Sequence, residues 1–131
     1  MKSLLTLVMA SLLLAGVSNA STFDTIASSK NYRARVVFPN GGPTKGANRI
    51  AINITSRSGQ PVANALIGIE YLMPSLPGRK PMMTYRTTTR GIGASREASL
   101  NLTMTGEWKV ILTVTVPPKR AERMAFGIVV N

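Results

Sequence analysis

The chain has no cysteine and no histidine among its 131 residues. Without thiolate or imidazole it cannot build the usual zinc sites, blue-copper centres, cysteine-bound clusters or histidine-activated nucleophiles. Acidic residues are also few, and they are Asp24, Glu70, Glu97, Glu107 and Glu122. Their wide separation in the sequence supports no paired-carboxylate site. A serine–lysine pair is conceivable, but no spacing indicates one, so we expect that the protein is not an enzyme.

Aromatic residues and long apolar runs are scarce as well. The seven aromatics are not interleaved with cations as in nucleic-acid stacking platforms, so nucleic acid is not an expected partner. The one long apolar run, residues 4–15, follows Lys2 and precedes the small residues Ser18 and Ala20. This order is typical of a secretory signal peptide. An uncleaved membrane anchor is the alternative, but a span needs roughly 20 apolar residues.

We therefore expect cleavage after Ala20 and a mature protein that is periplasmic or secreted in a bacterium. No later segment is apolar and long enough to predict a transmembrane span. Cations dominate the mature chain, because removing Lys2 from the sixteen lysines and arginines leaves fifteen against five acids, about +10. One interpretation is a solvated exterior that keeps the protein soluble. The other is attraction to an acidic protein face, anionic lipid headgroups or an anionic envelope polymer.

Seven segments alternate apolar and polar residues with a period of two, which is typical of half-buried strands. They are residues 32–38, 48–55, 65–73, 84–90, 98–104, 107–116 and 123–130. Glycine and proline turn signals separate them, and the threonine- and arginine-rich segment 84–90 suits an exposed edge. The pattern predicts an all-β protein, an antiparallel immunoglobulin-like β-sandwich of about seven strands. We expect a signal peptide at 1–20, a flexible lead-in at 21–31 and the sandwich domain at 32–131, with Trp108 as the central core aromatic.

The connection 72–84 is unlike the rest of the chain, because it combines prolines, adjacent cations and methionines. Thioether sulfur favours Cu(I) over harder divalent ions and needs no deprotonation to bind. The candidate Cu(I) ligands in and near this connection are Met73, Met82, Met83 and Met104. No other cofactor is expected.

Packing is the competing interpretation of these methionines. Met73 and Met104 continue the inward alternation of their strands, so we expect these two to fill the core. Met82 and Met83 are adjacent and cannot both point inward in a strand, so we expect one of them to be exposed.

The same connection is also a candidate partner-binding surface. Prolines stiffen it, and a stiff loop loses less entropy on binding. The candidate partner-binding residues are Pro74, Leu76, Pro77, Arg79, Lys80 and Arg86. The cations among them count against a metal site because they raise the electrostatic cost of a bound cation. An ordinary connection between the two sheets is the alternative.

Three short motifs carry a family resemblance: Gly59-Gln-Pro-Val-Ala-Asn-Ala65, Tyr71-Leu-Met-Pro74 and Leu102-Thr-Met-Thr-Gly-Glu-Trp-Lys-Val-Ile-Leu112. In order and spacing they resemble the YtkA-like domain family, related to FixH-type proteins, over about residues 48–116. The resemblance implies an exported β-sandwich with a Met-Pro loop at one rim, often found near heavy-metal efflux or copper-oxidase assembly systems. The family pattern commonly has a second methionine two residues after the proline, where this chain has Leu76.

Two functions follow as hypotheses. The first is a non-enzymatic exported accessory module in copper or envelope homeostasis, which uses residues 72–84 for recognition and acts with a protein partner in the cell envelope. The second is a purely structural or interaction domain whose basic surface docks on an acidic protein or an anionic envelope polymer.

Overall fold

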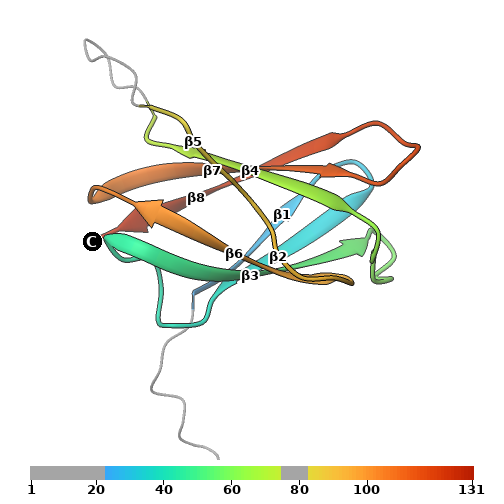
Figure 1. Cartoon of the computed structure of the whole chain (residues 1–131), viewed down its shortest axis with the longest axis horizontal. Coiled ribbons are helices and arrows are strands. Elements are labelled where there is room, and N and C mark those ends of the chain that lie inside the picture. The colour runs from blue at the N-terminus through green and yellow to red at the C-terminus, as the bar shows by residue number, and fades with distance from the viewer. Residues whose placement is uncertain (1–22, 75–82) are drawn as a thin grey trace, which may run out of the picture.

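The computed structural model describes residues 23–74 and 83–131, which form eight strands. These are β1 (Phe23–Ser28), β2 (Tyr32–Phe38), β3 (Gly46–Ser56), β4 (Leu66–Leu72), β5 (Tyr85–Thr88), β6 (Ser95–Leu102), β7 (Gly106–Thr115) and β8 (Glu122–Val130). They make two antiparallel four-stranded sheets, ordered β1-β2-β3-β6 and β5-β4-β7-β8, that pack face to face (Figure 1). The predicted antiparallel β-sandwich is confirmed. These two ranges contain no helix that is long and apolar enough to cross a membrane.

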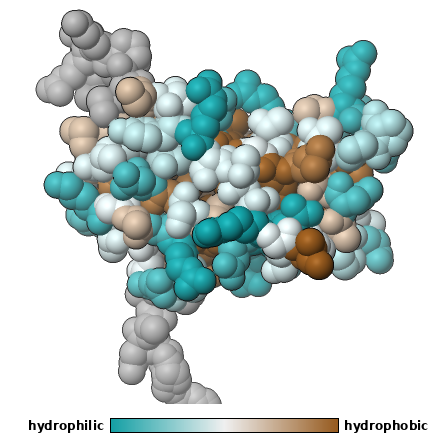
Figure 2. All heavy atoms as spheres, in the orientation of Figure 1, coloured by the Kyte–Doolittle hydropathy of each residue, from teal (hydrophilic) through white to brown (hydrophobic). Residues whose placement is uncertain are grey.

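Alternate residues of both sheets fill the core between them. Val36 and Ile52 in one sheet and Ile69 and Leu112 in the other are at most 1% exposed. Trp108 is also 1% exposed and lies in β7, an inner strand of its sheet. It is therefore a core residue, as the sequence predicts, although it lies near the start of β7 at one end of the sandwich and not at its centre. Hydrophilic side chains cover much of the face seen in Figure 2, with some exposed apolar side chains among them.

The expectation of a flexible lead-in at 21–31 is wrong for residues 23–28, which form β1. β1 pairs antiparallel with β2, from Phe23 opposite Phe38 to Ser28 opposite Arg33. Ala27 is the one residue of this strand that is fully buried, so its sequence lacks the strong apolar alternation that marks the other strands. β1 lies at the edge of its sheet and is held by its backbone pairing with β2.

Two of the expected strands also have different bounds. The predicted strand 98–104 begins earlier, at Ser95, and ends at Leu102. The predicted strand 84–90 is shortened to β5, and it lies at the edge of its sheet as expected. Beyond β5 the chain crosses to the other sheet, where Arg90 and Glu97 exchange two backbone hydrogen bonds of 2.7 and 2.9 Å. This crossing covers part of the free edge of β6.

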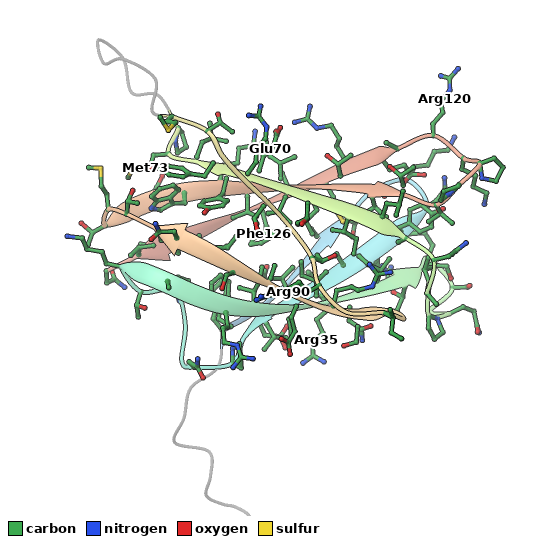
Figure 3. All side chains as sticks on the ribbon, in the orientation of Figure 1. Arg35, Glu70, Met73, Arg90, Arg120 and Phe126 are labelled. Carbon is green, nitrogen blue, oxygen red and sulfur yellow. The ribbon has the colours of Figure 1, made fainter. Side chains whose placement is uncertain are left out.

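The strand order gives the sandwich two ends with different connections. The end of β4, the start of β5 and the β6–β7 turn lie at one end, with the C-terminus (Figure 1). The β1–β2, β3–β4, β5–β6 and β7–β8 connections lie at the other end. Met73 and Arg120 mark these opposite ends in Figure 3. The two ends carry different side-chain chemistry.

Candidate functional site

Three methionines from separate chain segments lie at the end of the sandwich where β4 stops. Met73 follows β4, Met83 precedes β5, and Met104 lies in the turn between β6 and β7. β4 and β5 pair with Tyr71 opposite Tyr85, so Met73 and Met83 each stand two residues beyond the same paired position. We call Met73, Met83 and Met104 the methionine rim.

Aromatic rings form a layer beneath the methionine rim. The rings of Tyr71 and Tyr85 stack with their centroids 5.3 Å apart, and both lie about 6 Å from the Trp108 ring, at 5.9 and 6.0 Å. The indole Nε1 of Trp108 donates a hydrogen bond of 2.9 Å to the carbonyl oxygen of Met104. The hydroxyl oxygen of Tyr71 accepts one of 2.9 Å from the backbone N–H of Asn101. The rim therefore stands on a layer whose polar atoms are bonded to the β6–β7 segment.

Exposure differs among the three side chains of the methionine rim. Met83 is 71% exposed, in agreement with the expectation that one residue of the Met82–Met83 pair faces solvent. Met104 is 47% exposed. The expectation that Met104 fills the core is therefore wrong. The reason is that β6 ends at Leu102, so the inward alternation of the strand does not reach residue 104.

Met73 is half-buried and packs against the core, as expected. Its methyl carbon Cε lies 2.8 Å from the position that a Cβ at residue 106 would occupy. The thioether therefore uses the space left by Gly106, which also has a φ of +124°, a backbone conformation that favours glycine. The position of the Met73 sulfur depends on this missing side chain.

A carboxylate also lies beside the methionine rim. Glu107 lines the same hollow as Met73, Pro74 and Gly106, and it is exposed. Pro74 is exposed too. None of the ion pairs within the described ranges involves Glu107. Its negative charge would favour a cation bound beside Met73.

Arg86, a predicted partner-binding residue, is engaged with Glu70 on the outer face of its sheet. Its Nε donates to one carboxylate oxygen of Glu70 at 3.1 Å, and Arg123 lies 3.7 Å from the other oxygen. The Arg86 side chain is 71% exposed, so this pair contributes little to stability. Glu70 offsets part of the charge of Arg86, since it also contacts Arg123, and this weakens the electrostatic argument against a cation at the rim.

The remaining predicted site residues lie outside the described residues: Leu76, Pro77, Arg79, Lys80 and Met82. Within the described ranges no cluster of three or more histidine, cysteine or acidic side chains is placed to hold a metal.

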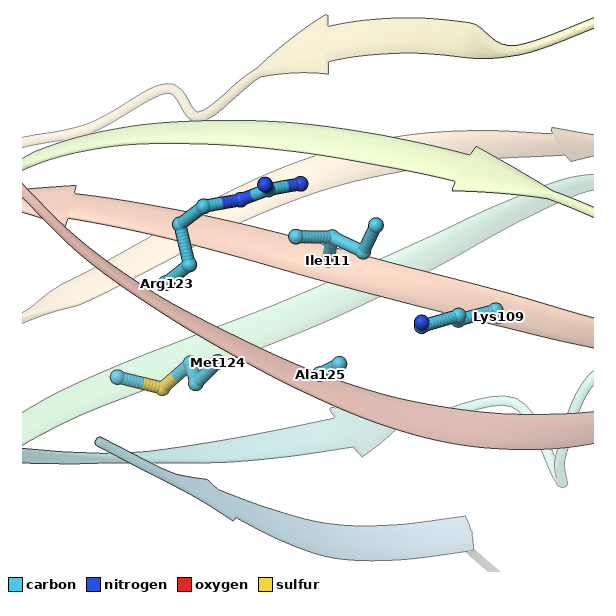
Figure 4. A pocket seen from close by; sticks show the side chains of 5 residues that line it. All are labelled: Lys109, Ile111, Arg123, Met124 and Ala125. Carbon is cyan, nitrogen blue, oxygen red and sulfur yellow. The ribbon is translucent and has the colours of Figure 1, made fainter.

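A second hollow lies on the outer face between β7 and β8, away from the methionine rim. Figure 4 shows Lys109 and Arg123 on either side of Ile111 and Ala125 there. Met124 also lines this hollow, but its side chain is only 3% exposed, and the two cations disfavour a bound metal ion. The methionine rim is therefore the better candidate for a metal.

A model of the YtkA-like family matches residues 26–113. The chain belongs to the YtkA-like family. The match runs from β1 to the last residues of β7 and includes all three residues of the methionine rim. It confirms the family resemblance of the three sequence motifs. No curated protein matches the chain at a significant level. Membership of the YtkA-like family supports a small accessory domain, in a family that is not known for enzymes.

Proposed function

We propose that this YtkA-like domain is a non-enzymatic exported accessory module that holds Cu(I) at the methionine rim. Met73, Met83 and Met104 supply thioether sulfurs, the ligand type that selects Cu(I). The observation that carries the proposal is the placement of these three residues, two at the ends of the β4–β5 connection and one in the β6–β7 turn, at one end of the sandwich. Two of them are substantially exposed, although methionine is ordinarily a core residue.

Electrostatics and protonation both suit this ion. Thioethers are neutral and lose no proton on binding, so a singly charged ion adds only one charge to an already basic protein. Glu107 lines the hollow beside Met73 and offsets part of that charge. Binding by thioethers is expected to vary little with pH between neutral and mildly acidic conditions.

The proposed role is to hold the ion and pass it to another protein of the cell envelope. Pro74 and the exposed side chains of Met83 and Met104 lie on the surface that such a partner would contact. The aromatic layer under the rim limits its rearrangement, and a preorganised surface loses less entropy on binding.

The test is a titration of the reduced protein with Cu(I) against a competing chromogenic chelator. Replacing Met83 and Met104 together by leucine removes two sulfurs and keeps the apolar volume. Affinity is expected to fall by about ten-fold or more, since even changes beside a ligand cost that much. Met124→Leu is the matched control, because Met124 is 3% exposed and lies in β8, inside the core. No competition by the wild-type protein, or an equal loss in the control, would contradict the proposal.

A second measurement locates the sulfurs directly. In protein labelled with ¹³C at the methionine methyl groups, Cu(I) or Ag(I) should shift the resonances of Met73, Met83 and Met104 and leave that of Met124 in place. Met82→Leu, tested alone, shows whether that residue adds a ligand. Shifts confined to residues other than the rim would count against the assignment.

A further inference from the structure

The end of the sandwich opposite the methionine rim carries four exposed cations on three connections. Lys30 lies between β1 and β2, Arg57 between β3 and β4, and Lys119 and Arg120 between β7 and β8. We call these four residues the basic end. Figure 3 shows Arg120 extending from this end into solvent.

Hydrogen bonds around one carboxylate join these three connections. Glu122, the first residue of β8, accepts hydrogen bonds from the Ser29 hydroxyl at 2.6 Å, the Asn31 backbone N–H at 3.0 Å and the Asn31 side-chain amide at 2.6 Å. The backbone N–H of Arg57 donates to the carbonyl oxygen of Asn31 at 3.2 Å. The four cations are therefore presented together on a frame with defined contacts.

The charge of the basic end is not neutralised within the described ranges. Across the described ranges, the arginines that form ion pairs are Arg35, Arg49, Arg86 and Arg123, and none of these belongs to the basic end. The acid at this end, Glu122, is occupied by uncharged donors from Ser29 and Asn31. Four cations thus face solvent against one carboxylate.

We propose that the basic end docks this domain on an anionic lipid surface. The exposed residues beside the cations are small or lack aromatic rings: Ser58, Gly59, Pro117, Pro118 and Ala121. Protein interfaces depend on tryptophan, tyrosine and arginine anchors, and this end has the arginines but no exposed aromatic ring among the described residues. Single-stranded nucleic acid depends on aromatic stacking. A layer of anionic headgroups needs only several cations close to one another, and each contributes roughly a five-fold increase in partitioning. The charge and side-chain chemistry of this end match that surface best.

The docking would be peripheral and reversible, because it rests mainly on charge. Exposed apolar side chains also lie toward this end, Leu66 at the start of β4 and Ile92 between β5 and β6, but they come from separate elements. It would also orient the protein. β7 has ten residues and runs from the rim toward the basic end, a length of about 30 Å. A domain docked by its basic end therefore holds the methionine rim away from the lipid, open to a protein partner. The inference does not depend on copper binding.

Sedimentation with lipid vesicles tests the proposal on the mature chain. The vesicles are mixtures of phosphatidylglycerol and phosphatidylcholine, with pure phosphatidylcholine as the neutral reference. The test variant carries Lys30→Gln, Lys119→Gln and Arg120→Gln. The matched control carries Lys45→Gln, Arg49→Gln and Lys109→Gln, which removes three exposed cations from other parts of the surface. Both variants therefore have the same net charge.

The wild-type protein is expected to bind the anionic vesicles and not the neutral ones, and binding should weaken steeply as salt is raised. The test variant should lose about 100-fold in partitioning, and the control should lose far less. Equal losses in the two variants would overturn the proposal, because net charge alone would then explain the attraction. So would binding that resists salt, or no binding to anionic vesicles.

Polyglutamate, a soluble acidic polypeptide, represents an acidic protein partner in the same assay. If the wild-type protein binds polyglutamate and ignores anionic vesicles, the basic end recognises an acidic protein and the lipid proposal is wrong. If it binds vesicles and polyglutamate displaces it only at a large excess of charge, the lipid surface is supported.

Discussion

Gly106 shows how one residue connects the core to the methionine rim. Its φ of +124° lies where side-chain-bearing residues are strained, and a Cβ there would stand 2.8 Å from the methyl carbon of Met73. The two constraints act together, since relief of the contact by a shift of Met73 leaves the backbone strain in place. Gly106 therefore determines both where β7 begins and where the Met73 thioether lies.

Gly106→Ala is expected to destabilise the domain by about 1–3 kcal/mol, the cost of holding a residue other than glycine in this conformation. Gly68→Ala is the matched control, because a Cβ there meets nothing within 4 Å and its φ is ordinary. Its effect should lie within about 0.5 kcal/mol of zero. Chemical denaturation of both variants, followed by circular dichroism, measures the difference. Similar values for the two glycines would show that the conformation at 106 is not strained.

At the scale of elements, β8 is attached to the opposite sheet through its first residue. The Glu122 carboxylate accepts hydrogen bonds from Ser29 and Asn31, in the connection between β1 and β2. These bonds stabilise the charged carboxylate and hold the pKa of Glu122 below its ordinary value. Asp24 also has a lowered pKa, because Arg35 donates hydrogen bonds to its carboxylate from the neighbouring strand. Both acids link the edge strand β1 to its surroundings.

The lowered pKa of Glu122 predicts a loss of stability in acid. The folded chain protonates this carboxylate at a lower pH than the unfolded chain does, so the stabilisation is present above the ordinary glutamate pKa of about 4.3 and is lost as pH falls through the lowered value. Glu122→Gln should flatten this part of the stability–pH profile. It should also speed hydrogen exchange at the Asn31 amide, which donates to Glu122.

Asp24→Asn is the control for that prediction. This substitution removes another acid with a lowered pKa, so it also flattens part of the stability–pH profile. It leaves the hydrogen bonds to Glu122 in place, because Asp24 bonds to Arg35. Exchange at the Asn31 amide should stay unchanged in this variant. If Glu122→Gln leaves that exchange rate as it is, the carboxylate does not order the β1–β2 connection.

At the scale of the whole molecule, the sandwich separates two kinds of chemistry. Neutral sulfur and an exposed acid lie at one end, and four cations lie at the other. The strands that join the two ends are hydrogen-bonded along their length, so the distance between the ends is set by the sheets and not by side chains. A domain arranged in this way can attach by one end and present the other.

We predict that the whole chain is exported and cleaved once. Expressed in a bacterium, the full chain should yield a periplasmic protein that begins at Ser21, two residues before β1 starts at Phe23. Intact mass measurement of the periplasmic fraction checks this. Ala20→Trp should prevent processing, because the cleavage site needs a small residue there. A mature protein that begins within β1, or an unprocessed soluble chain, would contradict the predicted cleavage site.

Most of the strands can be predicted from the local alternation of apolar and polar residues. Alternation with a period of two gives the strands around Val36, Ile52 and Leu112, because side chains of a strand point alternately to its two faces. Trp108 is predictable as a core residue for the same reason. β1 is harder to predict, because Ala27 is its only fully buried residue and the strand is held by pairing with β2.

The sequence by itself determined which chemistries this protein lacks, which segments become strands and which residue types are left to bind anything. Only the tertiary structure decided that Met73 rests on Gly106 beside Glu107, that Met104 turns outward, and that Lys30, Arg57 and Arg120 share one end. The physical reason is that strand formation and the choice of buried face depend on residues that are close in the sequence. Which distant connections meet depends instead on the pairing order of the strands, which local pattern does not contain.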